Sequence, residues 1–191
     1  MTLHPQISDK LEQIERVVIE TQEPGVRIID KTGPLANPAD RDHCIQYMVA
    51  IALLFGRLNA GDYEDRIAND PRVDALRAVM QVKENPTFTQ EYYAADKRYI
   101  GNAVQVFFKD GSSTEKVSVD FPIGHRRRRA EGIPVLVEKF NQSVAAHFGT
   151  RRLAAIRDLF GDRKRLGAMP VDRFVDGLVL RASGRKPPAR S

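Results

Sequence analysis

The sequence predicts an α+β fold in which a small mixed sheet with a β-hairpin packs on a long buried helix and is followed by C-terminal helices. Residues 14–21 and 104–121 carry the alternating apolar pattern of strands, and residues 44–55 form an almost unbroken apolar run. Amphipathic segments follow from residue 134 onward. The chain has 191 residues, of which 42% are hydrophobic, so it suits one domain, or one domain with appended helices, that buries a sizeable core.

Residues 14–21 (IERVVIET) are the first predicted strand, because they contain a β-branched run and place Val17 and Ile19 on one side. The PGVRIID segment that follows begins with a Pro-Gly breaker, which predicts a turn back across the sheet edge. The next segment, GPLANP, has the composition of a loop.

Residues 37–55 are expected to form a single helix. Asn37 can accept a hydrogen bond from the first free backbone N–H groups, and Pro38 is tolerated at the first helical position. Gly56 predicts the C-terminal end of the helix. Because this helix is apolar almost all round, we expect it to be the central buried helix of the domain.

Shorter elements connect this helix to a hairpin. A short helix is expected near Asp62, and a second one from Asp70, with apolar residues at helical spacing. The QVKEN segment is compatible with a short strand, and residues 86–99 with a loop or a broken helix.

The clearest local signal is the β-hairpin. Apolar residues alternate up to Asp110-Gly111, a favoured type I′ turn pair, and alternate again on the way back. The apolar residues of the two strands are Val104, Val106, Phe108, Val117, Val119 and Phe121. Such a hairpin needs a covering layer, which the helix at residues 37–55 can supply.

Three amphipathic helices are predicted after the hairpin. The first covers residues 134–148 and starts at Pro134, the second is capped by Thr150, and the last is opened by Pro170. They could cover the sheet, form their own small bundle or dock on something absent, and the pattern does not choose among these. Residues 182–191 have the composition of a disordered tail.

The charge is distributed unevenly along the chain. The net charge is +5, but residues 1–125 hold 14 basic and 19 acidic side chains, whereas residues 126–191 hold 16 and 6. The basic region suits a nucleic acid, a membrane surface, an anionic ligand or an acidic partner, and the alternative is a solvated basic face. The N-terminus lacks the apolar region of a signal peptide, and no apolar stretch reaches the roughly 20 residues that span a bilayer. We therefore expect a soluble, cytoplasmic protein.

Residue counts and spacing disfavour several classes of site. Cys44 is the only cysteine, so this chain alone builds no disulfide and no multi-cysteine metal site. Its place in the apolar run favours a core residue over a nucleophile. The four histidines are far apart without HxxxH spacing, which disfavours a metal site, and the sequence has no Gly-rich phosphate loop and no GxSxG elbow.

A polar helix face is the first candidate site. His43, Gln46, Tyr47 and Ala50 fall at positions i, i+3, i+4 and i+7 of the predicted helix and so share one face. Unpaired N–H groups near a helix N-terminus favour anions, so this face could bind a carboxylate-rich ligand, with His43 as an acid or base. The alternative is a polar rim in which Asp40 or a backbone group satisfies His43.

A basic loop is the second candidate. Gly124 and His125 precede four consecutive arginines, which suits phosphate or carboxylate binding or non-specific nucleic-acid contact. The alternatives are a solvated loop and an anchor to an acidic surface. No aromatic residues interleave with the arginines, which argues against nucleic acid.

Four motifs closely resemble the C-terminal region of the MmgE/PrpD family: GVRIIDKTGPLANPADRDHCIQYMVA, LLFGRL, NDPRVDALR and FPIGHRRRRAEGIPVLVEKF. The match runs in order from about Leu11 to Leu180, and the NPADRDHCIQY stretch resembles the branch that dehydrates 2-methylcitrate. The resemblance implies that residues 1–132 are an α+β lid-like domain whose first elements are missing. It also implies that residues 133–181 are helices that pack on a large N-terminal helical domain absent from this chain.

The resemblance further implies an activity, the elimination of water from 2-methylcitrate to give 2-methyl-cis-aconitate in propionate catabolism, without a metal or other cofactor. It implies a homodimer whose partners are a tricarboxylate substrate and the helical domain, with no nucleic acid and no membrane. The isolated chain is expected to be inactive, because the family's catalytic histidines, aspartate and first lysine lie in the absent part. The rival hypothesis is a stand-alone basic interaction or nucleic-acid-binding module.

The resemblance also assigns roles to four residues. Tyr47 matches the lid-helix tyrosine of the family and, with His43, is expected to be catalytic. Arg41 and His125 are expected to bind substrate. The arginine of the family pattern falls on Asp42, so Arg41, one place earlier, is the candidate for contacting a carboxylate.

Overall fold

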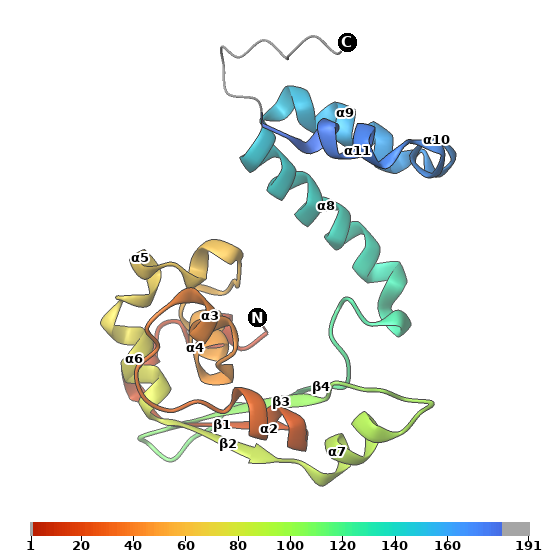
Figure 1. Ribbon diagram of the computed structural model, residues 1–191. Helices are drawn as coiled ribbons and strands as arrows, with labels where there is room; N and C mark the ends of the chain where they lie inside the picture. Colours follow the sequence, from red (N-terminus) through yellow and green to blue (C-terminus); the bar gives the residue numbers. More distant parts are fainter. Residues whose placement is uncertain (1, 181–191) are drawn as a thin grey trace. The chain divides into compact units, whose positions relative to one another are not determined.

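The computed structural model describes residues 2–180, which form two compact units that divide between Pro122 and Ile123 (Figure 1). Each unit is described by itself. The tail at residues 182–191, predicted to be disordered, lies outside the described residues. No helix within residues 2–180 is both long enough and apolar enough to cross a membrane.

The first unit contains the predicted mixed sheet, with four strands in the order β2-β1-β3-β4. Strand β1 (Ile14–Thr21) has the predicted bounds and pairs in parallel with β2 (Met80–Glu84). Its other edge pairs antiparallel with β3 (Asn102–Phe108), which pairs antiparallel with β4 (Val117–Val119). The α+β prediction is therefore confirmed.

The first unit also contains short helices. They are α1 (His4–Ile7), η1 (Leu11–Gln13), α2 (Glu23–Ile29), α3 (Pro38–Asp42), α4 (Ile45–Phe55), η2 (Ala60–Tyr63), α5 (Asp65–Ala68), α6 (Pro71–Ala78) and α7 (Pro86–Tyr93). Figure 1 shows α4 and α6 on the same side of the sheet. The connection from β1 to the parallel β2 runs through the helices from α2 to α6, since a parallel pair needs a long crossover connection.

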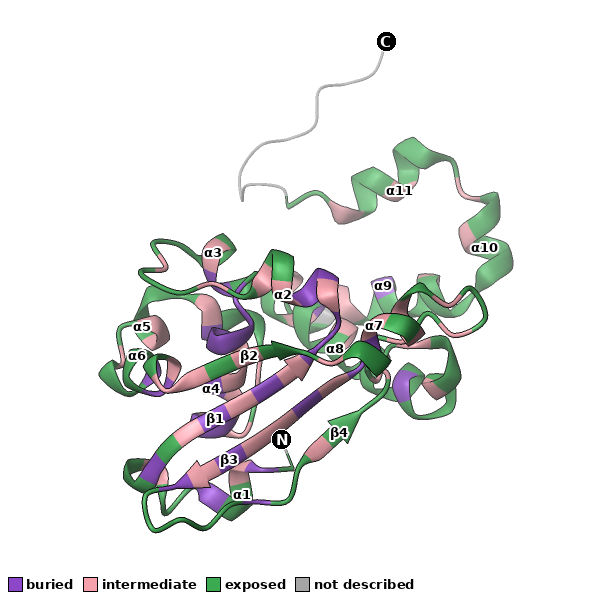
Figure 2. Ribbon diagram, turned by 90° about the horizontal axis from the view of Figure 1, so that it is seen from below, coloured by how far each residue is buried: buried purple, intermediate pink, exposed green. Residues whose placement is uncertain are grey.

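The core lies between α4 and the sheet. Ile51 of α4, Val17 of β1 and Val106 of β3 are completely buried there. Buried and less buried positions alternate along β1 and β3 (Figure 2), because successive side chains of a strand point to opposite faces. Burying each such side chain stabilises the fold by about 1.5–3 kcal/mol, so α4 is the central buried helix, as predicted.

The helix predicted at residues 37–55 is instead two helices. Asn37 caps α3 as expected, because its side chain accepts a hydrogen bond from the Asp40 N–H at 3.0 Å. The helical backbone then ends at His43, and Cys44 is extended (φ −125°, ψ 110°). Neighbouring segments impose this break, since the Cys44 thiol donates to the carbonyl of Lys31 at 3.4 Å. The prediction of one continuous helix was therefore wrong, although the stop at Gly56 is confirmed, with φ +65°.

The segment after β1 is also helical, where the sequence predicted a turn. Gln22 is the extended N-cap residue of α2, and Pro24 lies in the first turn, where proline is tolerated. Gly25 packs against the end of the strand, because a Cβ there would lie 2.6 Å from the Thr21 hydroxyl oxygen. The Pro-Gly pair thus starts a helix closely packed on β1. The QVKEN segment, which was compatible with a short strand, forms most of β2. Residues 86–99, expected to be a loop or a broken helix, contain the helix α7.

The hairpin strands are confirmed, but their turn differs from the predicted one. A type I′ turn needs positive φ at both central residues, and of Asp110 and Gly111 only the glycine has it, at +84°. The Gly111 N–H donates to the Phe108 carbonyl and the Phe108 N–H to Ser112. This pattern is a three-residue loop with a glycine bulge. Strand β4 ends at Val119, so Phe121 lies outside the ladder.

The second unit consists of helices. They are η3 (Arg126–Arg128), α8 (Arg129–Phe148), α9 (Thr150–Gly161), α10 (Arg163–Ala168) and α11 (Val171–Leu178). Helix α8 begins before Pro134, which lies inside it, and the cap of α9 is Gly149 rather than Thr150. The ring of Phe160 lies 5.1 Å from that of Phe140 and 6.1 Å from that of Phe174. The helices of this unit therefore contact one another through these rings.

Candidate functional site

Arg41 is the second-last residue of α3, and its side chain is turned into the protein. The residue is 4% exposed. One guanidinium nitrogen donates to the main-chain carbonyl of Tyr63 at 2.6 Å, and the other pairs with the Asp65 carboxylate at 2.7 Å. The guanidinium therefore ties residues 60–65 to α3. Its Nε has no hydrogen-bond partner within residues 2–180.

Tyr47 lies in the first turn of α4 and is 1% exposed. Its hydroxyl donates to the main-chain carbonyl of Asp62 at 2.6 Å, and its ring stacks on that of Tyr63, 5.9 Å away. Burial raises the pKa of the Tyr47 phenol above its ordinary value, against a smaller lowering by the Arg41 charge. The phenol is consequently protonated at neutral pH and acts as a hydrogen-bond donor.

Asp62 carries the main-chain carbonyl that accepts the Tyr47 hydrogen bond. The sequence did not indicate it as a site residue. Its buried carboxylate accepts two hydrogen bonds from Arg57, at 2.9 and 3.2 Å, and one from the Asn59 N–H at 2.8 Å. Asn59 and Asp62 form a capping box around η2. The three-residue spacing of Asn59 and Asp62 is the sequence signal that could have predicted this capping box. Asp62 thereby fixes the carbonyl that holds the Tyr47 hydroxyl.

His43 lies at the break between α3 and α4 and faces outward. Its side chain is 62% exposed, and its Nδ1 hydrogen-bonds the carboxylate of Asp42. The sequence placed His43, Gln46 and Tyr47 on one helix face, and this is wrong because His43 precedes α4. Gln46 and Tyr47 are buried, whereas His43 is exposed. His43 is satisfied by Asp42 rather than by Asp40, which instead accepts the Ala36 N–H.

Gln46 and Cys44 belong to the interior of this junction. The Gln46 amide donates to the Asp30 carboxylate and accepts from the Lys31 N–H at 3.3 Å. The buried Cys44 thiol is free and lies 3.4 Å from the Gln46 amide oxygen, so the prediction of a core cysteine is confirmed. These contacts hold the segment before α3 against the start of α4.

His125 lies in the second unit. Its Nδ1 accepts the N–H of Arg127 at 3.2 Å, so the imidazole caps η3. Three arginines after it, Arg126, Arg127 and Arg128, are engaged in interactions, including an ion pair of 2.9 Å between Arg128 and Glu131. Of the four predicted residues, the structure therefore brings Arg41 and Tyr47 together beside residues 62–65. It leaves His43 at the surface of the first unit and places His125 on the basic loop of the second.

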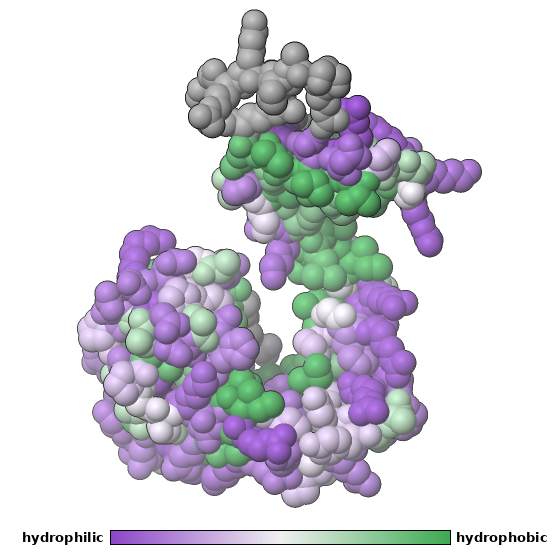
Figure 3. Space-filling model, in the orientation of Figure 1, coloured by the Kyte–Doolittle hydropathy of each residue, from purple (hydrophilic) through white to green (hydrophobic). Residues whose placement is uncertain are grey.

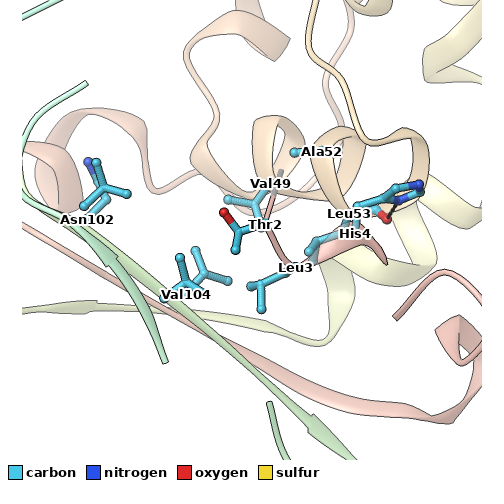
Figure 4. Close-up of a pocket in the computed structure, with 10 residues that line it drawn as sticks. Thr2, Leu3, His4, Val49, Ala52, Leu53, Asn102 and Val104 are labelled. Carbon is cyan, nitrogen blue, oxygen red and sulfur yellow. Dashed lines mark hydrogen bonds between the residues drawn. The ribbon is translucent and has the colours of Figure 1, made fainter. Parts of the chain in front are cut away.

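A separate apolar pocket of about 200 Å³ lies between α4 and the sheet of the first unit (Figure 4). Val49 and Leu53 of α4 face Val104 of β3 across it, and β4 contributes two further valines. At its rim, His4 hydrogen-bonds the carbonyl of Leu53 at 2.8 Å. None of the four predicted site residues lines this pocket. In the part of the chain that the structure describes, no cluster of three side chains could hold a metal ion.

Helix α8 of the second unit exposes apolar side chains all round its N-terminal half. Ile133, Val135, Leu136 and Val137 are between 49% and 55% exposed. Successive helical residues point about 100° apart, so the exposed residues 133–137, with Pro134 among them, are spread around the helix axis. Figure 3 shows hydrophobic surface along this helix. A helix that is apolar on all sides is typical of a segment buried by a partner.

Comparisons with known proteins match nearly the whole chain. The family model described as MmgE/PrpD C-terminal domain matches residues 1–161. A 2-methylcitrate dehydratase of Salmonella typhimurium is 54% identical over 94% of this chain, and one of Cupriavidus necator is 55% identical over 85%. A mitochondrial 2-methylcitrate dehydratase of Yarrowia lipolytica is 51% identical over 86%. The chain spans 38%, 34% and 31% of the lengths of these three relatives, respectively.

Proposed function

This chain belongs to the MmgE/PrpD family, and from that premise we propose that it forms the C-terminal part of a 2-methylcitrate dehydratase. The observation that carries the proposal is the 54% identity over 94% of the chain to the Salmonella typhimurium enzyme of that name. The reaction would remove water from 2-methylcitrate to give 2-methyl-cis-aconitate. The enzyme would be a hydro-lyase, and this chain alone would be inactive.

The elimination needs three kinds of group. A base removes the proton from a carbon next to a carboxylate, and the electron pair of that C–H bond forms the double bond. An acid donates a proton to the departing hydroxyl, which leaves as water. Cationic or N–H groups hold the carboxylates and stabilise the developing charge.

We assign supporting roles in this reaction to the four residues expected from the sequence, while the base would come from the part of the enzyme that this chain does not include. His43, exposed beside Asp42, would act in catalysis by orienting a substrate carboxylate. Tyr47 would be a hydrogen-bond donor or proton relay, and its raised pKa keeps the phenol protonated for the first of these roles. Arg41 and His125 would bind carboxylates, and the unpartnered Nε of Arg41 is the donor that residue has left. For substrate to take the Tyr47 hydrogen bond, the Asp62 carbonyl has to release it.

We propose that residues 1–132 act as a lid-like domain and that residues 133–181 dock on an N-terminal helical domain of the complete enzyme. The exposed apolar residues of α8 support this docking, because one groove in a larger protein could bury them all. The length of the relatives supports it too, since the chain accounts for only 38% of the Salmonella protein.

We also propose a cytoplasmic homodimer that needs no metal and no other cofactor, as the family resemblance implies. Light scattering of the assembled enzyme tests the dimer. Turnover that is unchanged after treatment with a chelator tests the independence from metal. Loss of turnover that added divalent metal restores would remove this part of the proposal.

Reconstitution from two chains tests the docking and the activity together. This chain is co-expressed with the N-terminal portion of the Salmonella enzyme, and dehydration of 2-methylcitrate is followed by the absorbance of the conjugated product. We expect co-purification and turnover, and loss of both with Val135→Glu on α8. Lys164→Glu, an exposed change on α10, is the control and should leave both intact. Failure of the two wild-type chains to associate or react would count against the proposal.

A further inference from the structure

We infer that Asp65 competes with the substrate for Arg41: its carboxylate holds the edge of the guanidinium that a substrate carboxylate takes over on binding. This role rests on the proposed function and deepens it, because it names the group that sets the affinity at this arginine. The pairing of the two side chains is incomplete. Arg41 Nη2 lies 2.7 Å from an Asp65 carboxylate oxygen, whereas the adjacent Nε has no hydrogen-bond partner within residues 2–180.

The Nε and Nη2 groups of Arg41 form one edge of the guanidinium. A carboxylate that binds this edge side-on accepts two parallel hydrogen bonds, and such bidentate pairs are stronger than single contacts. A buried donor without a partner is costly, so the contact with Asp65 leaves this edge partly unsatisfied. A substrate carboxylate that binds both nitrogens removes that cost.

Asp65 lies between the buried arginine and the solvent. The Arg41 side chain is 5% exposed, whereas that of Asp65 is 74% exposed. The edge that carries Nη2 therefore faces outward through the Asp65 carboxylate, and it opens when this side chain turns away. Asp65 is the first residue of α5, a helix of four residues none of which is buried, so this movement disturbs no core residue.

Arg41 keeps its orientation when Asp65 leaves. Its Nη1 donates to the main-chain carbonyl of Tyr63 at 2.6 Å, and this hydrogen bond does not involve the Asp65 side chain. A buried cation needs a counter-charge, because an unpaired charge in the interior is costly. Asp65 supplies that charge before substrate binds, and a substrate carboxylate supplies it afterwards. The apparent affinity is lowered by the fraction of molecules in which Asp65 holds the edge.

Arg77 shows the arrangement in which such an exchange is blocked. It is also buried, its Nε also has no partner within residues 2–180, and it pairs with an equally exposed carboxylate, that of Asp74. At Arg77, however, the carboxylate contacts Nη1, and Nη2 donates to the main-chain carbonyl of Gly33 at 2.8 Å. A fixed carbonyl thus occupies the edge beside Nε, so no carboxylate can bind it side-on. Asp74 is therefore the matched control for Asp65.

Citrate binding to the 191-residue chain tests this role without any activity. Titration calorimetry at constant ionic strength compares the unmutated chain with Asp65→Asn and Asp74→Asn, each of which removes one carboxylate that is 74% exposed. We expect Asp65→Asn to bind citrate about fivefold more tightly, the population shift that one such ion pair produces, and Asp74→Asn to stay within about 1.5-fold. Unchanged affinity in Asp65→Asn, equal tightening in both variants, or no binding by any of the three proteins would overturn the inference.

The Nε–H signal of Arg41 gives a second measurement that needs no change at Asp65. In ¹H–¹⁵N spectra of the unmutated chain, citrate should shift this signal and leave that of Arg77 in place. The two signals are assigned from those that Arg41→Lys and Arg77→Lys remove. If neither signal moves, or if both move together, the edge of Arg41 is not the site.

Kinetics separate this inference from the proposed function, in the Salmonella enzyme whose matched region is replaced by this chain. Asp65→Asn should lower KM for 2-methylcitrate by about fivefold, because a competitor of substrate binding is lost, whereas Asp74→Asn should not. An unchanged KM in Asp65→Asn would overturn the inference. If the unmutated chimera forms no product, the proposed function fails, while citrate binding and the Nε–H signal still decide the role of Asp65.

Discussion

The hydroxyl of Tyr47 makes a single contact whose loss can be worked out from the structure. Tyr47→Phe removes the 2.6 Å hydrogen bond to the Asp62 carbonyl and keeps the ring, its burial and its stacking on Tyr63. A buried hydrogen bond contributes about 0.5–1.5 kcal/mol net, and a buried acceptor left without its partner costs more. We therefore expect the free energy of unfolding of the first unit to fall by about 1–2 kcal/mol.

Tyrosine fluorescence during urea unfolding measures this change in the first unit alone, because all five tyrosines lie between residues 47 and 99 and the chain has no tryptophan. Tyr63→Phe is the matched control. Its ring is half-buried in the same stack, and its hydroxyl makes no hydrogen bond within residues 2–180, so we expect a loss below about 0.5 kcal/mol. Equal losses in the two variants, or no loss in Tyr47→Phe, would refute the assignment of this hydrogen bond.

Three further predictions concern the helix stop, the sheet and the basic region. In a urea titration, Gly56→Ala should lower the free energy of unfolding by about 1 kcal/mol or more, because φ is +65° and a Cβ would lie 2.6 Å from the His4 ring. Gly61→Ala is the control and should change the free energy of unfolding little, because a Cβ there would meet open space. The pKa of Glu20 is lowered in the folded protein, chiefly because the Asn85 amide donates a hydrogen bond to its carboxylate. The ionised carboxylate therefore stabilises the fold at pH values above its ordinary pKa, and this stabilisation is lost as the pH falls through the lowered pKa. The unfolding free energy of Glu20→Gln should accordingly fall less than that of the wild type between about pH 5 and about pH 3. In a gel-shift titration across salt, the chain should show no strong, salt-sensitive binding to DNA or RNA, and tight binding that weakens steeply with salt would favour the rival module.

Sequence reasoning worked where short-range physics decides the structure. The β-branched run of residues 14–21, the cap at Asn37 and the stop at Gly56 each depend on a few adjacent residues, and all three occur as predicted. The hairpin strands follow from their alternation in the same way, whereas the type of turn depends on the backbone angle at Asp110.

The parts that escaped prediction are those that distant contacts determine. The helix breaks at Cys44, whose thiol contacts the carbonyl of Lys31, 13 residues away, and Arg41 turns inward because its acceptors lie in the segment after α4. No periodicity in residues 37–55 encodes those partners. The same break moves His43 out of the helix face that includes Tyr47.

The candidate site was therefore predicted in part. The sequence indicated residues 41–47 as a candidate, and the structure brings Arg41 and Tyr47 together there. The partners that define their geometry, Asp62 and Tyr63, lie 15 or more residues further along the chain and become apparent once η2 is packed against α3 and α4. The pairing of His43 with Asp42 is local, but it depends on the same backbone break.

The most direct test of the central claim is the rate at which a chimera dehydrates 2-methylcitrate. In this chimera, the chain replaces its matched region in the Salmonella enzyme, 183 aligned residues at 54% identity. We expect formation of the conjugated product within about tenfold of the parent rate, a difference of about 1.4 kcal/mol in the barrier, and no product from the isolated chain. A folded chimera that forms no product, or an isolated chain that turns over by itself, would contradict the account.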